Sequence, residues 1–153
     1  MKIEESIVAL DMTAQDCTEV ILGLAEMLRK AGYVGSSYGE ASVAREMVHP
    51  TGLPSKPICI AIPHADADDV ITSALAYASL KDPVMFRNMV EPEEELPVEM
   101  VFMIANGSPE EQVKALRRLA TLFGDPEKLV ELKALTQTDA IVAWFKAALE
   151  QAD

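Results

Sequence analysis

The most constraining feature of this chain is a short run of apolar residues, Ile58 to Ile62, that ends at a proline. The run is too short for an ordinary helix, and its β-branched isoleucines favour a strand. Because every side chain in the run is apolar, both faces of the strand must be covered by other elements. Pro63 has no amide hydrogen to donate, so the ladder ends there. The run therefore predicts a buried strand with His64 just beyond its end.

Helical patterns precede this strand. Apolar side chains in residues 17–31 recur at the spacing of one helix face, and Gly32 follows where a left-handed cap costs little. A shorter helix is expected over residues 38–48. Ser37 is expected to accept a hydrogen bond from an amide of its first turn, and Pro50 discourages continuation.

Helical patterns also follow the strand. Ser108 is a capping residue before a proline, with a glutamate three residues later, and predicts a helix that extends to Phe123. Asp125 and Thr138 open two further amphipathic helices. The strand is therefore expected to lie between helices contributed by both halves of the chain.

Other strands are expected at residues 73–80 and 98–104, with a weaker candidate at 6–10. The acidic stretch 91–95 between the first two is expected to be an exposed loop. Consecutive strands favour a mixed sheet over a purely parallel one. The pattern predicts one α/β domain over residues 1–153, a three-layer sandwich with a mixed β-sheet flanked by helices.

Charge and composition exclude several classes of function. The chain has 25 acidic and 13 basic residues, and its net charge of −12 opposes binding to nucleic acid or to an anionic membrane. A basic protein partner remains compatible. Two cysteines form no disulfide framework or zinc motif, and no apolar run approaches the roughly 20 residues that span a bilayer. With no signal-peptide pattern at its start, we expect a soluble cytoplasmic protein without direct membrane insertion.

His64 is the leading candidate for chemistry because it follows a strand end, a common place for a site. A neutral imidazole has a free lone pair near neutral pH and can attack phosphorus. The alternative is that a lone loop histidine only satisfies a backbone hydrogen bond. The neighbouring motifs have to decide between the two.

Several short motifs occur in a shared order along nearly the whole domain. They are Arg45-Glu46, Pro50-Thr51-Gly52-Leu53, Ile60-Ala61-Ile62-Pro63-His64, Pro83-Val84-Met85-Phe86, Leu96-Pro97-Val98, Val101-Phe102-Met103-Ile104-Ala105 and Pro109-Glu110-Glu111-Gln112. Each is weak alone, but their order and separations are specific. In this pattern the chain resembles the fructose/mannitol-type enzyme IIA family of the bacterial phosphotransferase system (PTS), as a single EIIA type-2 domain.

The resemblance implies a phosphoryl carrier. His64 would accept the phosphoryl group from the phosphocarrier protein HPr and pass it to a cysteine of enzyme IIB, with the membrane component IIC involved only indirectly. Arg45 would pair with phosphoryl oxygens and stabilise the transferring group. Thr51 and Gly52 are expected to offer a hydroxyl and a closely approaching amide, although a plain turn is the alternative. No cofactor and no metal are expected.

One departure from the family pattern concerns the helix that follows Ser108. Mannitol- and fructose-type members have a second histidine where this chain has Gln112, and the galactitol-type IIA is similar to this sequence there. Glutamine can donate a hydrogen bond to phosphoryl oxygen or imidazole, but it cannot relay a proton. The resemblance therefore favours galactitol or a related polyol, while the transported sugar and the phosphorylated ring nitrogen stay open.

Other polar residues near His64 are given lesser roles. His49 is read as a rim or packing substitution, and Glu46 as a capping or surface-pairing residue. Asp66 is expected to orient the imidazole or cap the next segment, and Asp68 and Asp69 are expected to be solvated charges.

Two alternative functions remain open. The domain could be a regulatory module whose phosphorylation at His64 selects a protein partner. It could instead be an open metal site for hydrolysis built from His49, His64 and Asp66, although no recognised ligand motif supports that reading.

Overall fold

The computed structural model describes residues 1–151, with side chains described to residue 149. Within that range the strands are β1 (Val8–Met12), β2 (Gly52–Leu53), β3 (Cys59–Ala61), β4 (Ala74–Arg87) and β5 (Glu95–Ala105). The helices are α1 (Cys17–Lys30), α2 (Tyr38–Val48), α3 (Pro109–Phe123), α4 (Pro126–Ala134) and α5 (Thr138–Gln151), with short 3-10 turns η1 (Glu5–Ile7) and η2 (Ala67–Asp69). The predicted domain extends to residue 153, and residues 152 and 153 lie outside the described part.

The strands form a single mixed sheet in the order β1-β4-β5-β3-β2. β4 runs parallel to β1 and antiparallel to β5, whereas β3 runs parallel to β5 and antiparallel to β2. The expectation of a mixed sheet is confirmed. β3 lies inside the sheet, as its uniformly apolar sequence requires.

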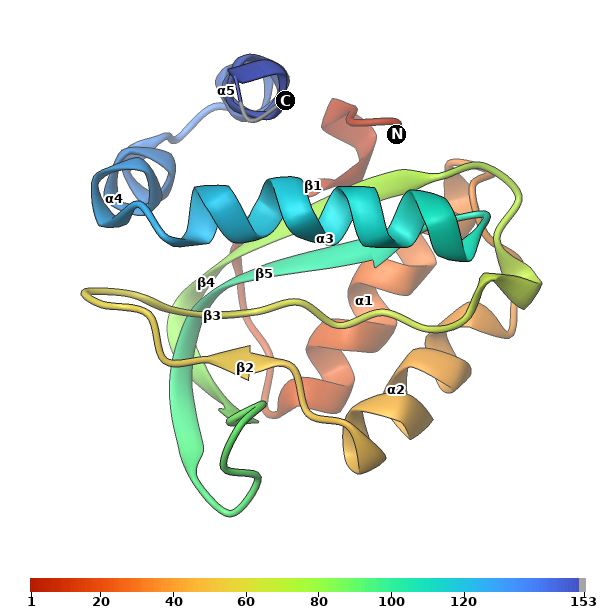
Figure 1. Cartoon of the computed structure of the whole chain (residues 1–153), viewed down its shortest axis with the longest axis horizontal. Coiled ribbons are helices and arrows are strands. Elements are labelled where there is room, and N and C mark those ends of the chain that lie inside the picture. The colour runs from red at the N-terminus through yellow and green to blue at the C-terminus, as the bar shows by residue number, and fades with distance from the viewer. Residues whose placement is uncertain (152–153) are drawn as a thin grey trace.

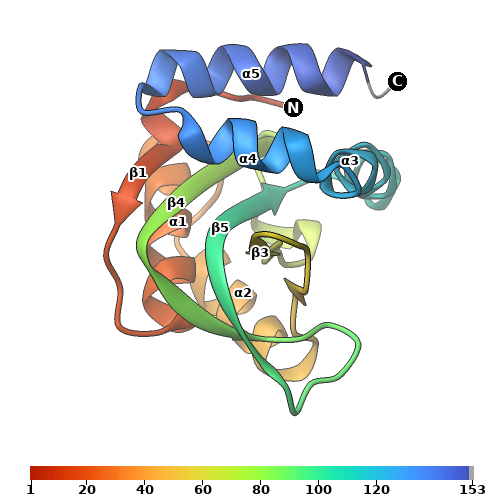
Figure 2. The ribbon, with the colours of Figure 1, turned by 90° about the vertical axis from the view of Figure 1, so that its left-hand side faces the viewer.

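Helices cover both faces of the sheet and produce the predicted three-layer α/β sandwich (Figures 1 and 2). Alternate residues of β4 point to opposite faces. Its alanines at 74, 76 and 78 belong to the core shared with α1, where small side chains let the helix lie close. Leu75 and Tyr77 belong to the second core, which α3, α4 and α5 complete.

The strand boundaries correct several predictions. β4 continues past residue 80 to Arg87, and β5 begins at Glu95, because the two strands form a long hairpin that extends beyond the irregularity between Ser79 and Val84. The acidic stretch is exposed as expected, but its last residue belongs to β5. β1 starts two residues later than expected. β2 was expected to be a turn, and it pairs with β3 instead.

The predicted helix starts are confirmed for α3 and α4. Ser108 accepts a hydrogen bond from the amide of Glu111, and Asp125 accepts from two first-turn amides of α4. The prediction for Ser37 is wrong: its side chain caps no amide of α2 and donates to Asp69 instead, because its backbone is helical rather than extended. Among the described residues, no helix has both the length and the apolar character that crossing a membrane requires.

Candidate functional site

His64 lies where β3 ends, next to the last residues of β5. The amide of Ile104 donates to the carbonyl of Pro63 at 3.2 Å, and His64 and Ile104 form an isolated parallel bridge. The chain is thus held to β5 on both sides of the point at which Pro63 leaves the ladder. The sequence placed His64 correctly just past the strand end.

The His64 cavity has a volume of about 360 Å³ and draws its walls from three separate segments. Its lining residues are Arg45, Val48, His49, Pro50, Thr51, His64, Met89 and Pro92. α2 and the turn after it form one side, and the turn between β4 and β5 contributes the last two residues. The fold therefore brings together Arg45, Thr51 and His64, which lie up to 19 positions apart in the sequence.

The imidazole of His64 is held in one orientation. Its Nδ1 lies 2.8 Å from the carbonyl oxygen of Ile62, and only 6% of the residue is exposed. A carbonyl can only accept, so Nδ1 must carry the hydrogen in the neutral ring. Nε2 is then left with the free lone pair, the one available to attack an electrophile.

The surroundings of His64 favour the neutral ring. Burial lowers the pKa of His64 most strongly, and the nearby positive charge of Arg45 lowers it further. The carbonyl of Ile62 and the negative charge of Asp66 act in the opposite direction and do not overcome the first two. The imidazole therefore stays an unprotonated nucleophile to lower pH than an exposed histidine would.

Tyr38 supports the segment from beneath. Its hydroxyl donates to the carbonyl of Ile104 at 2.5 Å and accepts from the amide of Ala65 at 3.3 Å. The side chain is fully buried, and this burial raises the pKa of Tyr38 to about 12. One phenol thus joins β5 to the residue that follows His64. Sequence reasoning missed this contact and used Tyr38 only as a helix start.

Glu46 and Thr51 form a buried pair beside the imidazole. Glu46 Oε2 accepts from the Thr51 amide at 2.8 Å, and Oε1 accepts from the Thr51 hydroxyl at 2.7 Å. Their exposed fractions are 6% and 1%, and burial is the main reason why the pKa of Glu46 is raised. Both hydrogens that Thr51 can donate go to Glu46. This geometry favours a positioning role for Thr51 and makes Glu46 a buried anchor, not the surface residue that was expected.

Gly52 is needed for a close approach between chain segments. A Cβ at this position would lie 2.5 Å from the carbonyl oxygen of Arg87, which excludes any larger residue without a shift of backbone. Its own carbonyl accepts from the amide of Met89 at 2.8 Å. Gly52 thus brings the turn between β4 and β5 against the segment that carries Thr51.

Arg45 and His49 lie at the C-terminal end of α2. The amide of His49 donates to the carbonyl of Arg45 at 2.6 Å. Both residues also line a neighbouring hollow of about 740 Å³, which Asp66, Asp68 and Asp69 border. His49 is exposed at the boundary of the two cavities, the rim position expected for it.

Gln112 lies in the first turn of α3, half buried. Its amide donates to the carbonyl of Ser108 as part of the helix. β5 leads from Ile104, the bridge partner of His64, to the start of α3, so the chain brings Gln112 to the same edge of the sheet. Gln112 is not among the described residues that line the His64 cavity.

The acidic residues after His64 differ from expectation. The Asp66 side chain does not cap η2, and the ring nitrogen of His64 that it was expected to orient is held by Ile62. Asp69 was expected to be a solvated charge, but its carboxylate accepts from the amide and hydroxyl of Ser37, both at 2.8 Å. Asp69 therefore ties the segment after His64 to the start of α2.

No support appears for the metal-site alternative. Among residues 1–149, no group of three or more histidine, cysteine, aspartate or glutamate side chains could hold a metal ion. His49 and His64 border one cavity, but no carboxylate lines it with them. We therefore set this reading aside.

The model of one protein family, the phosphoenolpyruvate-dependent sugar phosphotransferase system EIIA 2 family, matches residues 1–148. The chain is 33% identical over 150 residues to the fructose-specific EIIABC component of Bacillus subtilis, covering 93% of this chain and 22% of that protein. It is 28% identical over 135 residues to the galactitol-specific EIIA component of Escherichia coli K12, covering 88% and 89%. The chain thus spans about a fifth of the first relative and most of the second.

Solved structures share the fold. One is described as a putative PTS IIA (PtxA) from Streptococcus mutans, with a TM-score of 0.78, 21% identity and coverage of 99% of this chain and 95% of the other. Another is enzyme IIA for mannitol in complex with phosphorylated enzyme IIB from Escherichia coli, with a TM-score of 0.77, 24% identity and coverage of 95% and 98%. At these identities the likeness establishes the three-layer architecture.

Proposed function

Because the chain belongs to the EIIA 2 family of the phosphoenolpyruvate-dependent sugar phosphotransferase system, we propose that it carries a phosphoryl group on Nε2 of His64. The observation that carries this proposal is the 2.8 Å contact between His64 Nδ1 and the Ile62 carbonyl. That contact fixes the tautomer and leaves Nε2 as the nucleophile. The proposed location of this reaction is the cytoplasm.

The first step transfers the phosphoryl group from phosphorylated HPr. The Nε2 lone pair of His64 attacks phosphorus in line, a new N–P bond forms, and the bond to the donor atom of HPr breaks with its electron pair. Arg45 lines the same cavity and offsets the negative charge of the transferring group. Nδ1 keeps its hydrogen throughout, held by Ile62.

The second step passes the group to a cysteine of enzyme IIB. The thiolate attacks phosphorus, the N–P bond breaks, and its electron pair returns to Nε2, which restores the neutral ring. The printed description of the mannitol complex pairs an enzyme IIA with a phosphorylated IIB, which supports this partner class. The membrane component IIC would then be served only through IIB.

Three further residues receive roles in this proposal. Gln112, at the same edge of the sheet, would donate its side-chain amide to a phosphoryl oxygen. Thr51 and Gly52 shape the phosphoryl-binding cavity, Thr51 through Glu46 and Gly52 through its close approach to Arg87. The likeness to the galactitol-specific EIIA favours galactitol or a related polyol as the transported sugar.

The test is intact mass spectrometry after incubation with enzyme I, HPr and phosphoenolpyruvate. The parent protein should gain one phosphoryl group, and His64→Ala should gain none. His49→Ala is the matched control because it removes the other histidine of the same cavity and should still be labelled. Gln112→Ala should be labelled more slowly. An unlabelled parent, or label on His64→Ala, would contradict the proposal.

A second candidate function is a regulatory module that uses the phosphorylation of His64 to select a protein partner. The chain is 36% identical over 99 residues to the transcriptional regulator ManR of Bacillus subtilis, and its fold resembles the nitrogen regulatory protein IIA-Ntr of Neisseria meningitidis. Chasing labelled protein with an enzyme IIB separates the two functions. Transfer to the IIB cysteine supports transport, whereas label that stays on His64 supports regulation.

A further inference from the structure

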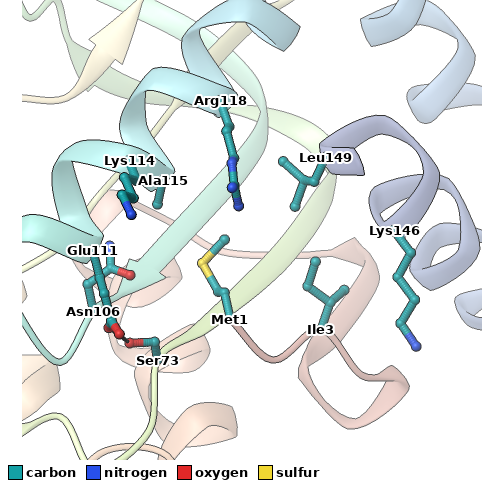
Figure 3. A pocket seen from close by; sticks show the side chains of 10 residues that line it. All are labelled: Met1, Ile3, Ser73, Asn106, Glu111, Lys114, Ala115, Arg118, Lys146 and Leu149. Carbon is teal, nitrogen blue, oxygen red and sulfur yellow. Dashed lines mark hydrogen bonds between the residues drawn. The ribbon is translucent and has the colours of Figure 1, made fainter. Parts of the chain in front are cut away.

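A second cavity, the α3–α5 cavity, has a volume of about 310 Å³ and shares no lining residue with the His64 cavity (Figure 3). Figure 3 shows side chains of α3 on one side, side chains of α5 on the other, and Met1 and Ile3 between them. Its lining residues are Met1, Ile3, Ser73, Asn106, Glu111, Lys114, Ala115, Arg118, Lys146 and Leu149.

This cavity is rich in positive charge for a chain of net charge −12. Lys114, Arg118 and Lys146 line it together with a single carboxylate, that of Glu111. Where side chains are described, neither Lys114 nor Lys146 forms an ion pair. Clustered cations on an acidic protein repel one another and attract an anion of complementary shape.

The polar groups at one end of the cavity are satisfied with one exception. The amide of Gly107 donates to the Ser73 hydroxyl at 2.9 Å, and that hydroxyl donates to Glu111 at 2.6 Å. Asn106 is only 2% exposed, yet its Nδ2 has no hydrogen-bond partner among the described residues. Figure 3 shows its amide turned toward the space between Glu111, Lys114 and Met1. A buried amide without an acceptor is costly, and an anion in the cavity would supply one.

The chemistry of the walls defines the ligand. A phosphate oxygen could accept from Asn106 and pair with Lys114, and Arg118 extends from the next turn of α3. Met1, Ile3, Ala115 and Leu149 add apolar surface, and the volume exceeds that of a single phosphate ion. We propose that the α3–α5 cavity binds a small organic phosphate, at a site separate from the phosphoryl carrier site at His64.

The test is isothermal titration calorimetry on the full chain with glycerol 3-phosphate as the probe, and with inorganic phosphate and glycerol for comparison. Glycerol 3-phosphate should bind saturably with a stoichiometry of one, and more tightly than either comparison ligand. The double variant Lys114→Gln/Lys146→Gln should weaken binding at least about tenfold, as expected when charge-assisted contacts are lost. Asn106→Asp should also weaken it, because a carboxylate repels the phosphate.

Two controls keep the result specific. Lys30→Gln/Lys81→Gln removes the same charge from exposed lysines outside the cavity and should bind like the parent. His64→Gln should also bind like the parent, which places the ligand away from the carrier site. The proposal is overturned if there is no saturable binding, if the two double variants lose affinity equally, or if His64→Gln alone abolishes binding. None of these outcomes bears on whether His64 is phosphorylated.

Discussion

The imidazole of His64 lies between two walls that are held in different ways. The α2 wall consists of Arg45, Glu46 and Thr51, and its central contacts are the buried hydrogen bonds from Thr51 to both oxygens of Glu46. The 65–69 wall consists of Ala65, Asp66 and Asp69, and its link to α2 is the contact between Asp69 and Ser37 at the surface. Loss of a partner costs more where water cannot replace it, so the two walls should respond differently to mutation.

The charges of the two walls are also opposite. Arg45 is a cation beside the cavity and Asp66 is an anion, and they move the pKa of His64 in opposite directions. A transferring phosphoryl group carries negative charge, so only the α2 wall can stabilise it. The comparison assigns transition-state stabilisation and rigidity to the α2 wall, and adjustment of the imidazole charge to the 65–69 wall.

The largest effect should follow from Arg45→Gln. Removal of the cation that faces the phosphoryl group is expected to slow phosphorylation of His64 by about 100- to 1,000-fold, the loss typical of one electrostatic donor. Rapid-quench measurement of the transfer rate from HPr checks this. Arg45→Lys should lie between, since it keeps the charge without the planar fork. An Asp66→Asn variant as slow as Arg45→Gln would contradict the division between the walls.

Glu46→Ala should have the largest effect on stability. It leaves the buried amide and hydroxyl of Thr51 without their acceptor and is expected to cost about 2–4 kcal/mol. Urea denaturation followed by circular dichroism measures this. Glu46→Gln is the matched control, because its amide oxygen can accept from the Thr51 amide while its NH₂ donates to the hydroxyl. Equal losses in the two variants would show that the hydrogen bonds do not stabilise the wall.

The third prediction concerns pH. The pKa of His64 is lowered in the fold from an ordinary value of 6.5, so its contribution to stability is fully present above that value. It is lost as pH falls through the folded pKa, because protonation then favours the unfolded chain.

The two walls should move this pKa in opposite directions. Arg45→Gln removes a cation and should raise the pKa of His64, whereas Asp66→Asn removes an anion and should lower it. NMR titration of the imidazole signals measures both shifts without reference to activity. Shifts of the same sign would mean that burial alone sets the protonation of His64.

The sequence predicted the parts of the site that depend on local pattern. β3 was identified because its apolar run has one explanation, and Pro63 defined the point at which His64 leaves the sheet. The starts of α3 and α4 were identified because a capping side chain acts within three residues of its own position. Arg45 and Thr51 were singled out through the family motifs rather than through any local rule.

The contacts that the sequence could not supply depend on chain reversals. The Tyr38 hydroxyl reaches a carbonyl 66 positions away, and Asp69 reaches Ser37 across 32 positions. The Glu46–Thr51 pair spans only five positions, but it forms because the chain turns back after α2 and both residues become buried. The continuation of β4 was missed because Lys81 and Asp82 interrupt the apolar pattern, while cross-strand pairing with β5 resumes beyond them.

The smallest effect should follow from Asp69→Ala on the 65–69 wall. The variant removes the acceptor for the amide and hydroxyl of Ser37, but both groups are exposed and water can replace it. A loss of about 1 kcal/mol is expected, as for other contacts at a helix start, with a decrease in Tm of about 2–4 °C. Differential scanning calorimetry measures this, and Asp68→Ala on the same turn is the matched control. The rate of phosphorylation should change little, because the Tyr38 hydroxyl still holds Ala65 to β5. A loss as large as that of Glu46→Ala would mean that the surface contact, and not only the buried pair, fixes the site around His64.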